Sequence, residues 1–227
     1  MNNPIRSLSR CEWALWLASL AVVLIANLMT PEPVPLTMAA ALVGVTSLVF
    51  AAKGNVWAQI LMIVFSILYG VISFRFRYWG EMITYLGMTL PMAVWSTVTW
   101  LKNPSKENGS EVAIQMLARR HLTLLAVSTV AVTAVFYFIL KALDTPSLFF
   151  STVSVITSFL AAALTMLRSS YYAMGYAAND VVLIVLWVMA SMDDPAYIPV
   201  AVNFGIFLLN DLYGFVSWKK REVLQAA

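Results

Sequence analysis

The chain has 227 residues, of which 61% are hydrophobic and 11% are charged, and its mean hydropathy is +0.82. This composition excludes a soluble globule with a polar surface and indicates an integral membrane protein. The net charge of +3 comes from Lys and Arg residues between apolar runs, which indicates lipid headgroups and no nucleic acid as partners. One cysteine, Cys11, and one histidine, His121, exclude an intrachain disulfide and leave too few ligands for a zinc or iron site, so we expect no metal and no cofactor.

Eight apolar segments are long enough to cross a bilayer, which takes about 20 residues per helix. Pro, Gly, Asn and Asp mark the breaks between them, as in Thr30-Pro31-Glu32-Pro33. No clear cleavage site follows the first segment, so we expect a retained helix and not a signal peptide. We expect residues 1–227 to form a single transmembrane domain of eight α-helices, in chain order Trp13–Met29, Pro35–Ala52, Val56–Phe74, Glu81–Leu101, Leu122–Ala142, Leu148–Leu167, Tyr171–Ser191 and Tyr197–Trp218.

The distribution of basic residues predicts the orientation. Eight crossings put both termini on one side, and eleven of the fourteen Lys and Arg residues then fall on that side. The remaining three are Arg75, Arg77 and Lys141. Basic loops are retained in the cytoplasm, so we expect both termini there and the chain in the cytoplasmic membrane.

A weak internal repeat is also visible. The segment Trp95 to Lys102 and the segment Tyr213 to Lys220 each contain an aromatic residue, four intervening residues, Trp and a base, 118 positions apart. Similar Thr-Ser pairs occur in the second and sixth segments. We therefore expect an extra helix over 13–29, one repeat over 35–101, a linker helix over 122–142 and a second repeat over 148–218. A single linker helix makes the two three-helix repeats parallel.

Two Asn-Asp pairs within apolar segments are the main candidates for function. Asn179-Asp180 and Asn210-Asp211 lie near mid-membrane by helix rise, where a carboxyl group is costly and usually marks a solute or ion path. At 100° per residue, Tyr172 and Tyr176 share a stripe with Asn179, and Asn203 and Phe207 share one with Asn210. Rings can stack on a flat heterocycle, Asn can bond to its edge, and a carboxylate can accept from sugar hydroxyls or face a cation.

The first repeat contributes a different set of residues. At the 118-residue offset Tyr85 corresponds to Asn203, whereas Met92 and Ala93 correspond to Asn210 and Asp211, so we expect an asymmetric site. Gln59, with Tyr85, is a candidate binding residue from this half. Further polar candidates are Ser66, Glu81, Thr84 and Thr89, although Glu81 at a helix start is also typical of a cap or surface group.

Alternatives from other classes stay open. The Asn and Asp side chains could join helices by hydrogen bonds with no solute involved. A buried Asp could serve as the proton site of a coupled carrier, and two carboxyl groups could act as an intramembrane aspartyl protease. The Gly-x-Gly-Asp type of motif of such proteases is missing, because Asp180 follows Ala-Ala-Asn.

The helix arrangement and the closing segment Asn210-Asp211-Leu-Tyr213-Gly214-Phe-Val-Ser-Trp218 resemble the PnuC-type vitamin transporters, the nicotinamide riboside carriers related in shape to SWEET sugar transporters. The resemblance runs from about Thr37 to Arg221. It implies a homotrimer of independent protomers, facilitated diffusion without ion coupling, and trapping of the imported nucleoside by a cytoplasmic kinase.

The chain departs from that family's pattern in one motif. Nicotinamide riboside members typically carry two tryptophans three apart, followed four residues later by Asn. This chain keeps Asn179 but has Tyr172 and Gly175 at the tryptophan positions. The family's Gln in the third core helix is also missing near Tyr85. Thiamine and deoxynucleosides therefore stand beside nicotinamide riboside and ordinary nucleosides as expected substrates.

Overall fold

α-Helices make up most of the described chain. The computed structural model describes residues 4–29, 35–75, 79–106, 109–145 and 147–226. The helices are α1 Arg10–Leu28, α2 Pro35–Ala52, α3 Trp57–Arg75, α4 Trp79–Thr84, α5 Leu90–Lys102, α6 Arg119–Ala142, α7 Leu148–Met166, α8 Tyr172–Asp193 and α9 Ile198–Ala226, with a π-helical turn η2 Tyr85–Thr89 and two 3-10 turns, η1 Pro4–Ser7 and η3 Pro195–Tyr197.

The prediction of an all-α membrane protein is confirmed. Within the described residues, seven helical stretches are long and apolar enough to cross a membrane: α1, α2, α3, α6, α7, α8, and η3 with α9. Their bounds agree with the expected ones to within a few residues, except at the end of α9. That helix continues to Ala226 and not to Trp218, because the polar residues after Trp218 bind the segment between α5 and α6.

The fourth expected segment differs in form from a regular helix. Residues 79–102 are helical throughout, but the helix widens over Tyr85–Thr89, where the Leu90 N–H donates to the Tyr85 carbonyl five residues back. Pro91 follows immediately and has no N–H to continue the regular ladder, which gives the physical reason for the π turn. The turn divides the segment into α4 and α5, each shorter than a membrane span.

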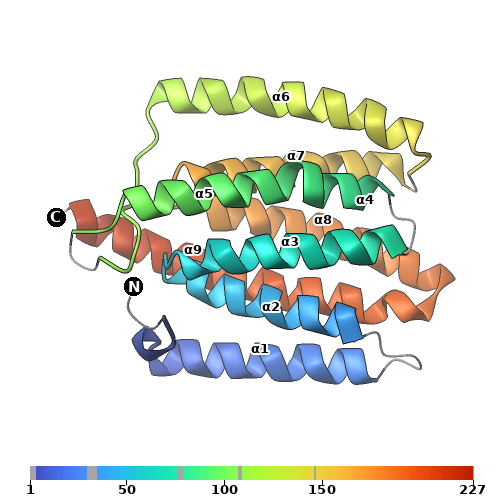
Figure 1. The fold of residues 1–227 in the computed structure, drawn as a ribbon, viewed down its shortest axis with the longest axis horizontal. Coiled ribbons are helices and arrows are strands. Elements are labelled where there is room, and N and C mark those ends of the chain that lie inside the picture. The colour runs from blue at the N-terminus through green and yellow to red at the C-terminus, as the bar shows by residue number, and fades with distance from the viewer. Residues whose placement is uncertain (1–3, 30–34, 76–78, 107–108, 146, 227) are drawn as a thin grey trace.

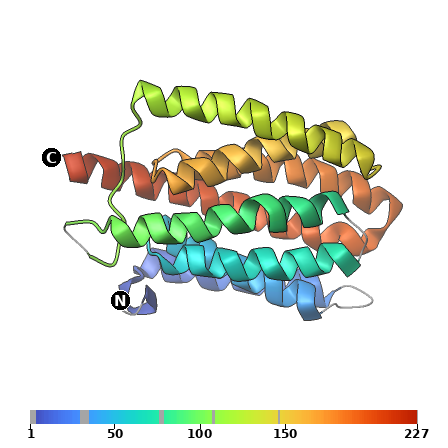
Figure 2. The same ribbon diagram turned by 45° about the horizontal axis from the view of Figure 1, so that its top comes forward.

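The helices lie side by side in one bundle (Figure 1). α8 packs between α7 and α9, α2 packs on α3 and α9, and α5 packs on α3 and α7. α1 and α6 lie on opposite edges of the bundle, as the rotated view also shows (Figure 2). Phe65, Trp187, Phe204 and Phe207 belong to the largest buried apolar cluster, which contains residues of α1, α2, α3, α8 and α9.

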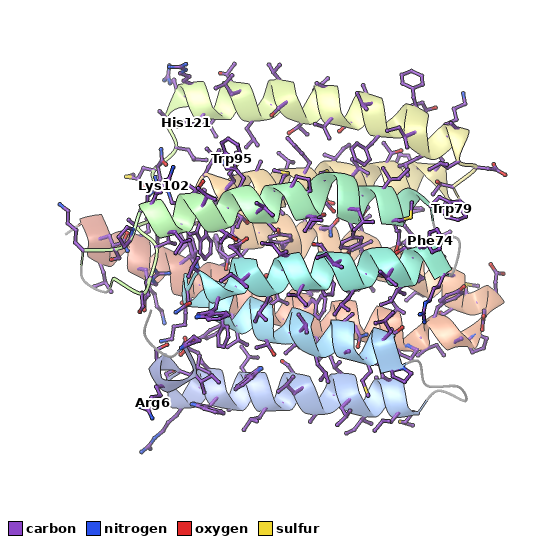
Figure 3. All side chains as sticks on the ribbon, viewed as in Figure 1. Arg6, Phe74, Trp79, Trp95, Lys102 and His121 are labelled. Carbon is purple, nitrogen blue, oxygen red and sulfur yellow. The ribbon has the colours of Figure 1, made fainter. Side chains whose placement is uncertain are left out.

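Both described ends of the chain lie at the same end of the bundle (Figure 1). We call this the terminal end and the opposite one the distal end. Arg6, Lys102 and His121 lie at the terminal end, whereas Phe74 and Trp79 lie at the distal end (Figure 3). The terminal end thus carries basic residues that the sequence placed on one side of the membrane.

A short segment, residues 110–115, lies across the terminal end; we call it the strap. The Val112 N–H donates to the Gly54 carbonyl at 2.9 Å, and the Gln115 N–H donates to the Arg168 carbonyl at 3.0 Å. Arg221 forms an ion pair with Glu111 at 3.1 Å and donates to the Val112 carbonyl. Burial lowers the pKa of the Arg168 guanidinium, which donates to the Ala113 carbonyl and to Gln115. The strap therefore joins the α2–α3 turn, the α7–α8 turn and α9.

Candidate functional site

A cavity lies among the central helices, and we call it the central cavity. Its empty volume is about 930 Å³ when the part open to the outside is included, within the size range of pockets for small organic solutes. Most of this space is narrow, because the centre of a water molecule reaches only ≈ 90 Å³ of it. Residues from α2, α3, α4, η2, α6, α7, α8 and α9 line the cavity, which therefore receives side chains from both expected repeats.

Aromatic side chains form one wall of the central cavity. Tyr85 and Phe207 line it together with Phe65, whose ring centroid lies 5.9 Å from that of Tyr85 and 6.1 Å from that of Phe207. Tyr69 packs behind Tyr85 at 4.4 Å. These distances are typical of packed aromatic pairs, so the wall offers flat apolar surfaces to a ring system.

A polar part of the lining comes from α7 and α8. The Oδ1 atom of Asn179 accepts hydrogen bonds from the hydroxyls of Ser154, Thr157 and Ser158, at 3.3, 2.8 and 2.9 Å. These residues occur at one face of α7, and their hydroxyls fix the orientation of the Asn179 amide. Since its oxygen is occupied, the amide nitrogen is the group left to donate to a solute.

Two carboxyl groups lie at the base of the central cavity. Asp180 of α8 and Asp211 of α9 are buried, with exposed fractions of 4% and 3%, and their carboxyl groups are within hydrogen-bonding reach of each other. The Oδ2 atom of Asp180 is buried without a hydrogen-bond partner among the described residues. Two such groups in a low-dielectric site need a proton or a cation between them.

Glu81 of α4 adds a third carboxyl group to the cavity lining. The Tyr69 hydroxyl bonds to it, and Tyr85 lies close by. Its place at a helix start is typical of a cap, but Glu81 is half-buried and lines the central cavity. No Lys, Arg or His lines this cavity in the part of the chain that the structure describes.

Six of the ten expected binding residues line the central cavity: Tyr85, Tyr176, Asn179, Asp180, Phe207 and Asp211. Asn203 and Asn210 instead face α1. Asn203 accepts from the Asn27 amide at 3.3 Å, and Asn210 donates to the Ser19 hydroxyl at 2.9 Å. Asn203 and Asn210 were expected to face the cavity together with Phe207. They do not, because α1 covers their side of α9, whereas Phe207 and Asp211 face the cavity.

Tyr172 and Gln59 are also buried away from the cavity. Tyr172 packs its ring 4.6 Å from that of Trp218, which in turn lies 5.6 Å from Trp100. We call these three residues the aromatic plug. The Trp100 indole donates to the Thr165 carbonyl, and the Trp218 indole donates to the Ala51 carbonyl. The plug clusters with Val112 of the strap, and Tyr172 also lies 6.3 Å from the ring of Tyr176, which lines the central cavity.

A second cavity opens at the distal end, and we call it the vestibule. The centre of a water molecule reaches ≈ 570 Å³ of it, so it is much wider than the central cavity. Acidic Asp144 and Asp193 lie in its lining, together with Trp79, Trp187 and Tyr197. Glu81 lines both cavities. Nothing in the sequence indicates that Glu81 lies near Asp144 and Asp193, because the three residues belong to segments far apart in the chain.

The sequence of the chain matches the family described as nicotinamide mononucleotide transporters over residues 34–220. The chain belongs to this family. It is 25% identical to the nicotinamide riboside transporter PnuC of Neisseria mucosa over 189 residues, covering 82% of this chain and 72% of that protein. It is 26% identical to the PnuC of Haemophilus influenzae over 209 residues, covering 91% and 88%.

A solved structure shows the same fold. The crystal structure of the vitamin B3 transporter PnuC has a TM-score of 0.82 to this chain at 23% identity, and the match covers 96% of this chain and 94% of that one. The resemblance to PnuC-type transporters that the closing segment predicts is therefore confirmed. As a member of a transporter family, the chain is a multi-pass membrane transporter and not an enzyme, which excludes the aspartyl protease alternative.

Proposed function

We propose that this transporter takes up a nucleoside-like organic cation, with nicotinamide riboside as the first candidate. The observation that supports this most is the pairing of an aromatic wall with three carboxyl groups in a cavity without a basic lining residue among the described ones. A positively charged ring gains both from an aromatic face and from a nearby carboxylate. The PnuC relatives are named for nicotinamide riboside, which carries such a ring.

We place the solute by pairing each of its chemical groups with a side chain that can bind it. The charged ring lies beside Tyr85 and Phe207, where it also faces Asp180 and Asp211. The Asn179 amide nitrogen donates to a carbonyl or hydroxyl oxygen of the solute, and the carboxyl groups accept from sugar hydroxyls. Because the cavity is narrow, binding requires that Tyr85, Phe207 or Phe65 rotate to admit the ring.

The absent tryptophan pair is relevant to substrate choice. A Cβ atom on Gly175 would lie 2.8 Å from the Ala161 Cα, so a larger side chain there requires α7 and α8 to separate. In this chain most of the aromatic surface comes from α3, η2 and α9, and α8 adds only Tyr176. Thiamine, a second aromatic cation, remains an alternative substrate, whereas neutral nucleosides and deoxynucleosides would use the carboxyl groups only as hydroxyl acceptors.

We infer eight membrane crossings in a single domain, with α4, η2 and α5 forming the fourth, and both termini in the cytoplasm. The division into an extra helix and two parallel three-helix repeats is supported by matching turns. Gly54 bonds back to Ala51, and Asn55 to Phe50; Arg168 bonds back to Thr165, and Ser169 to Leu164. Both turns pass through a residue with positive φ, Gly54 and Arg168. The Trp100 and Trp218 indoles each donate to the first helix of the other half.

We further propose facilitated diffusion in the cytoplasmic membrane, with a cytoplasmic kinase that phosphorylates and so traps the solute. A homotrimer is the proposed assembly. Its support here is that α6 and α1 lie at the edges of the bundle and leave most of their apolar surface uncovered.

The test is uptake by purified protein in proteoliposomes. We expect uptake of nicotinamide riboside without any imposed ion gradient, and slower uptake of adenosine and deoxyadenosine. The rate of nicotinamide riboside uptake should fall at least tenfold in Asp211→Asn. Faster uptake of thiamine than of nicotinamide riboside would identify thiamine as the substrate. Uptake that requires an inward proton gradient would contradict facilitated diffusion and indicate proton coupling at Asp180 and Asp211. Equal uptake of all four solutes by wild type and Asp211→Asn would contradict the proposed site.

A further inference from the structure

The central cavity and the vestibule share part of their walls. Gly80, Glu81, Thr145, Ser151 and Leu186 line both. A solute that enters from the distal end therefore passes between α4, the α6–α7 turn, α7 and α8 before it reaches Asp180 and Asp211. We call this shared region the neck.

Acidic groups occur at each stage of this path. Asp144 and Asp193 are exposed in the vestibule, Glu81 is half-buried in the neck, and Asp180 and Asp211 are buried at the base. No basic residue appears in the lining of either cavity, as far as the structure describes the chain. Arg75 and Lys141 lie at the ends of α3 and α6, but both are exposed and belong to neither lining.

The carboxyl groups are arranged along the path and not around one ion. Among the described residues, no group of three acidic, His or Cys side chains is close enough to hold a metal ion. Asp180, whose buried Oδ2 atom has no hydrogen-bond partner among the described residues, lines the inner part of the path. This arrangement suits a mobile organic cation that moves from one carboxyl group to the next.

We propose that Glu81 determines specificity at the neck: its carboxylate admits cationic solutes from the vestibule to the central cavity and disfavours anionic ones. This inference rests on the proposed function for the identity of the solute. Tyr69 positions the carboxylate by its hydroxyl, and the Tyr69 ring packs on Tyr85 of the aromatic wall. A carboxylate in a narrow, partly dry passage acts more strongly than one on the surface, because water screens it less.

The first test uses uptake of nicotinamide riboside. Glu81→Gln keeps the size and the hydrogen bonds of the side chain but removes the charge. We expect its KM for nicotinamide riboside to rise about threefold to tenfold with little change in kcat, whereas Glu81→Asp keeps most of the wild-type KM. Asp194→Asn is the matched control. Asp194 is an exposed acidic residue at the distal end and lines neither cavity. Its side chain caps η3, and Asn caps a helix equally well.

The second test needs no transported solute. In a Cys11→Ser background, which removes the only cysteine, Ser151→Cys places a thiol in the neck. Its reaction rate is measured with a cationic and an anionic thiosulfonate reagent of similar size, added from outside. We expect the cationic-to-anionic rate ratio to fall about threefold to tenfold when Glu81→Gln is added, and to stay unchanged with Glu81→Asp or Asp194→Asn.

The outcomes separate the two proposals. An unchanged ratio in Glu81→Gln, an equal fall in Asp194→Asn, or a thiol that no reagent reaches would overturn the role of Glu81. A fall confined to Glu81→Gln in a protein that does not take up nicotinamide riboside would support the role of Glu81 and contradict the substrate instead.

Discussion

Asn179 and Asn203 have the same side chain but different surroundings, and this difference makes a residue-scale prediction. Asn179 is held by three hydroxyls on the cavity wall, whereas Asn203 bonds to Asn27 at the seam between α9 and α1. Asn179→Ala should remove the thermal stabilisation that nicotinamide riboside gives to the purified protein, because it deletes the amide that orients the solute.

Asn203→Ala is the matched control. It should lower the melting temperature without solute, since a buried hydrogen bond of about 1 kcal/mol is lost, but keep the stabilisation by solute. A solute effect that survives in Asn179→Ala and disappears in Asn203→Ala would contradict the placement of the site.

At this scale one principle, the cost of polar groups within apolar spans, selected Asn179, Asp180 and Asp211, which the structure places in the lining of the central cavity. The same principle also selected Asn203 and Asn210, which satisfy the hydrogen-bonding need by contact with α1. Helical periodicity gives the face on which a side chain lies, but it does not tell which neighbouring helix covers that face. For the same reason, periodicity did not indicate that Glu81 of α4 lines the central cavity.

At the scale of helices, Gly175 sets how closely α7 and α8 approach. A Cβ atom there would lie 2.8 Å from backbone of α7, whereas a Cβ atom on Gly205 of α9 meets nothing within 4 Å. We expect Gly175→Ala to reduce stability by about 1–3 kcal/mol, through forced separation of the helices.

Gly205→Ala should leave stability unchanged or raise it by up to about 1 kcal/mol, because Ala is the better helix former. Both variants are compared by thermal unfolding in the same detergent. Equal stability of Gly175→Ala and wild type would show that α7 and α8 do not pack as closely as described.

The strap gives a second prediction at this scale. Arg221 pairs with Glu111, donates to Val112 and lies over the Trp218 ring at 5.3 Å. Arg221→Ala should release the strap and increase cleavage of the chain between α5 and α6 by an added protease. Lys220→Ala, at an exposed neighbour, should cleave at the wild-type rate. The cleavage rate by gel measures this difference, and equal rates in both variants would contradict the role of the strap.

Helix positions were predictable because runs of about 20 apolar residues in lipid must satisfy their backbone within the helix. The π turn and the extension of α9 were not, because each depends on a local or tertiary contact. Pro91 acts on the ladder of its own helix, and Gln225 of α9 accepts from the Ile114 N–H of the strap. Neither effect changes the hydropathy of the segment.

At the scale of the whole molecule, the two ends of the proposed solute path differ. The distal end opens through the vestibule, and the terminal end is filled by the aromatic plug beneath the strap. A transporter must also reach a state in which the terminal end is open, so we expect Trp100, Tyr172 and Trp218 to separate during transport. The sequence showed the repeated Trp residues but not that their indoles each bond to the other half.

The central claim is that carboxyl groups in the central cavity select a cationic ring. The most direct measurement is binding of nicotinamide riboside and of its uncharged dihydro form, which has nearly the same shape, to wild type and to Asp180→Asn with Asp211→Asn. We predict that wild type binds the cation at least about tenfold more tightly, and that the double variant loses this preference. Equal binding of the two forms by wild type, or a preference that persists in the double variant, would contradict the claim.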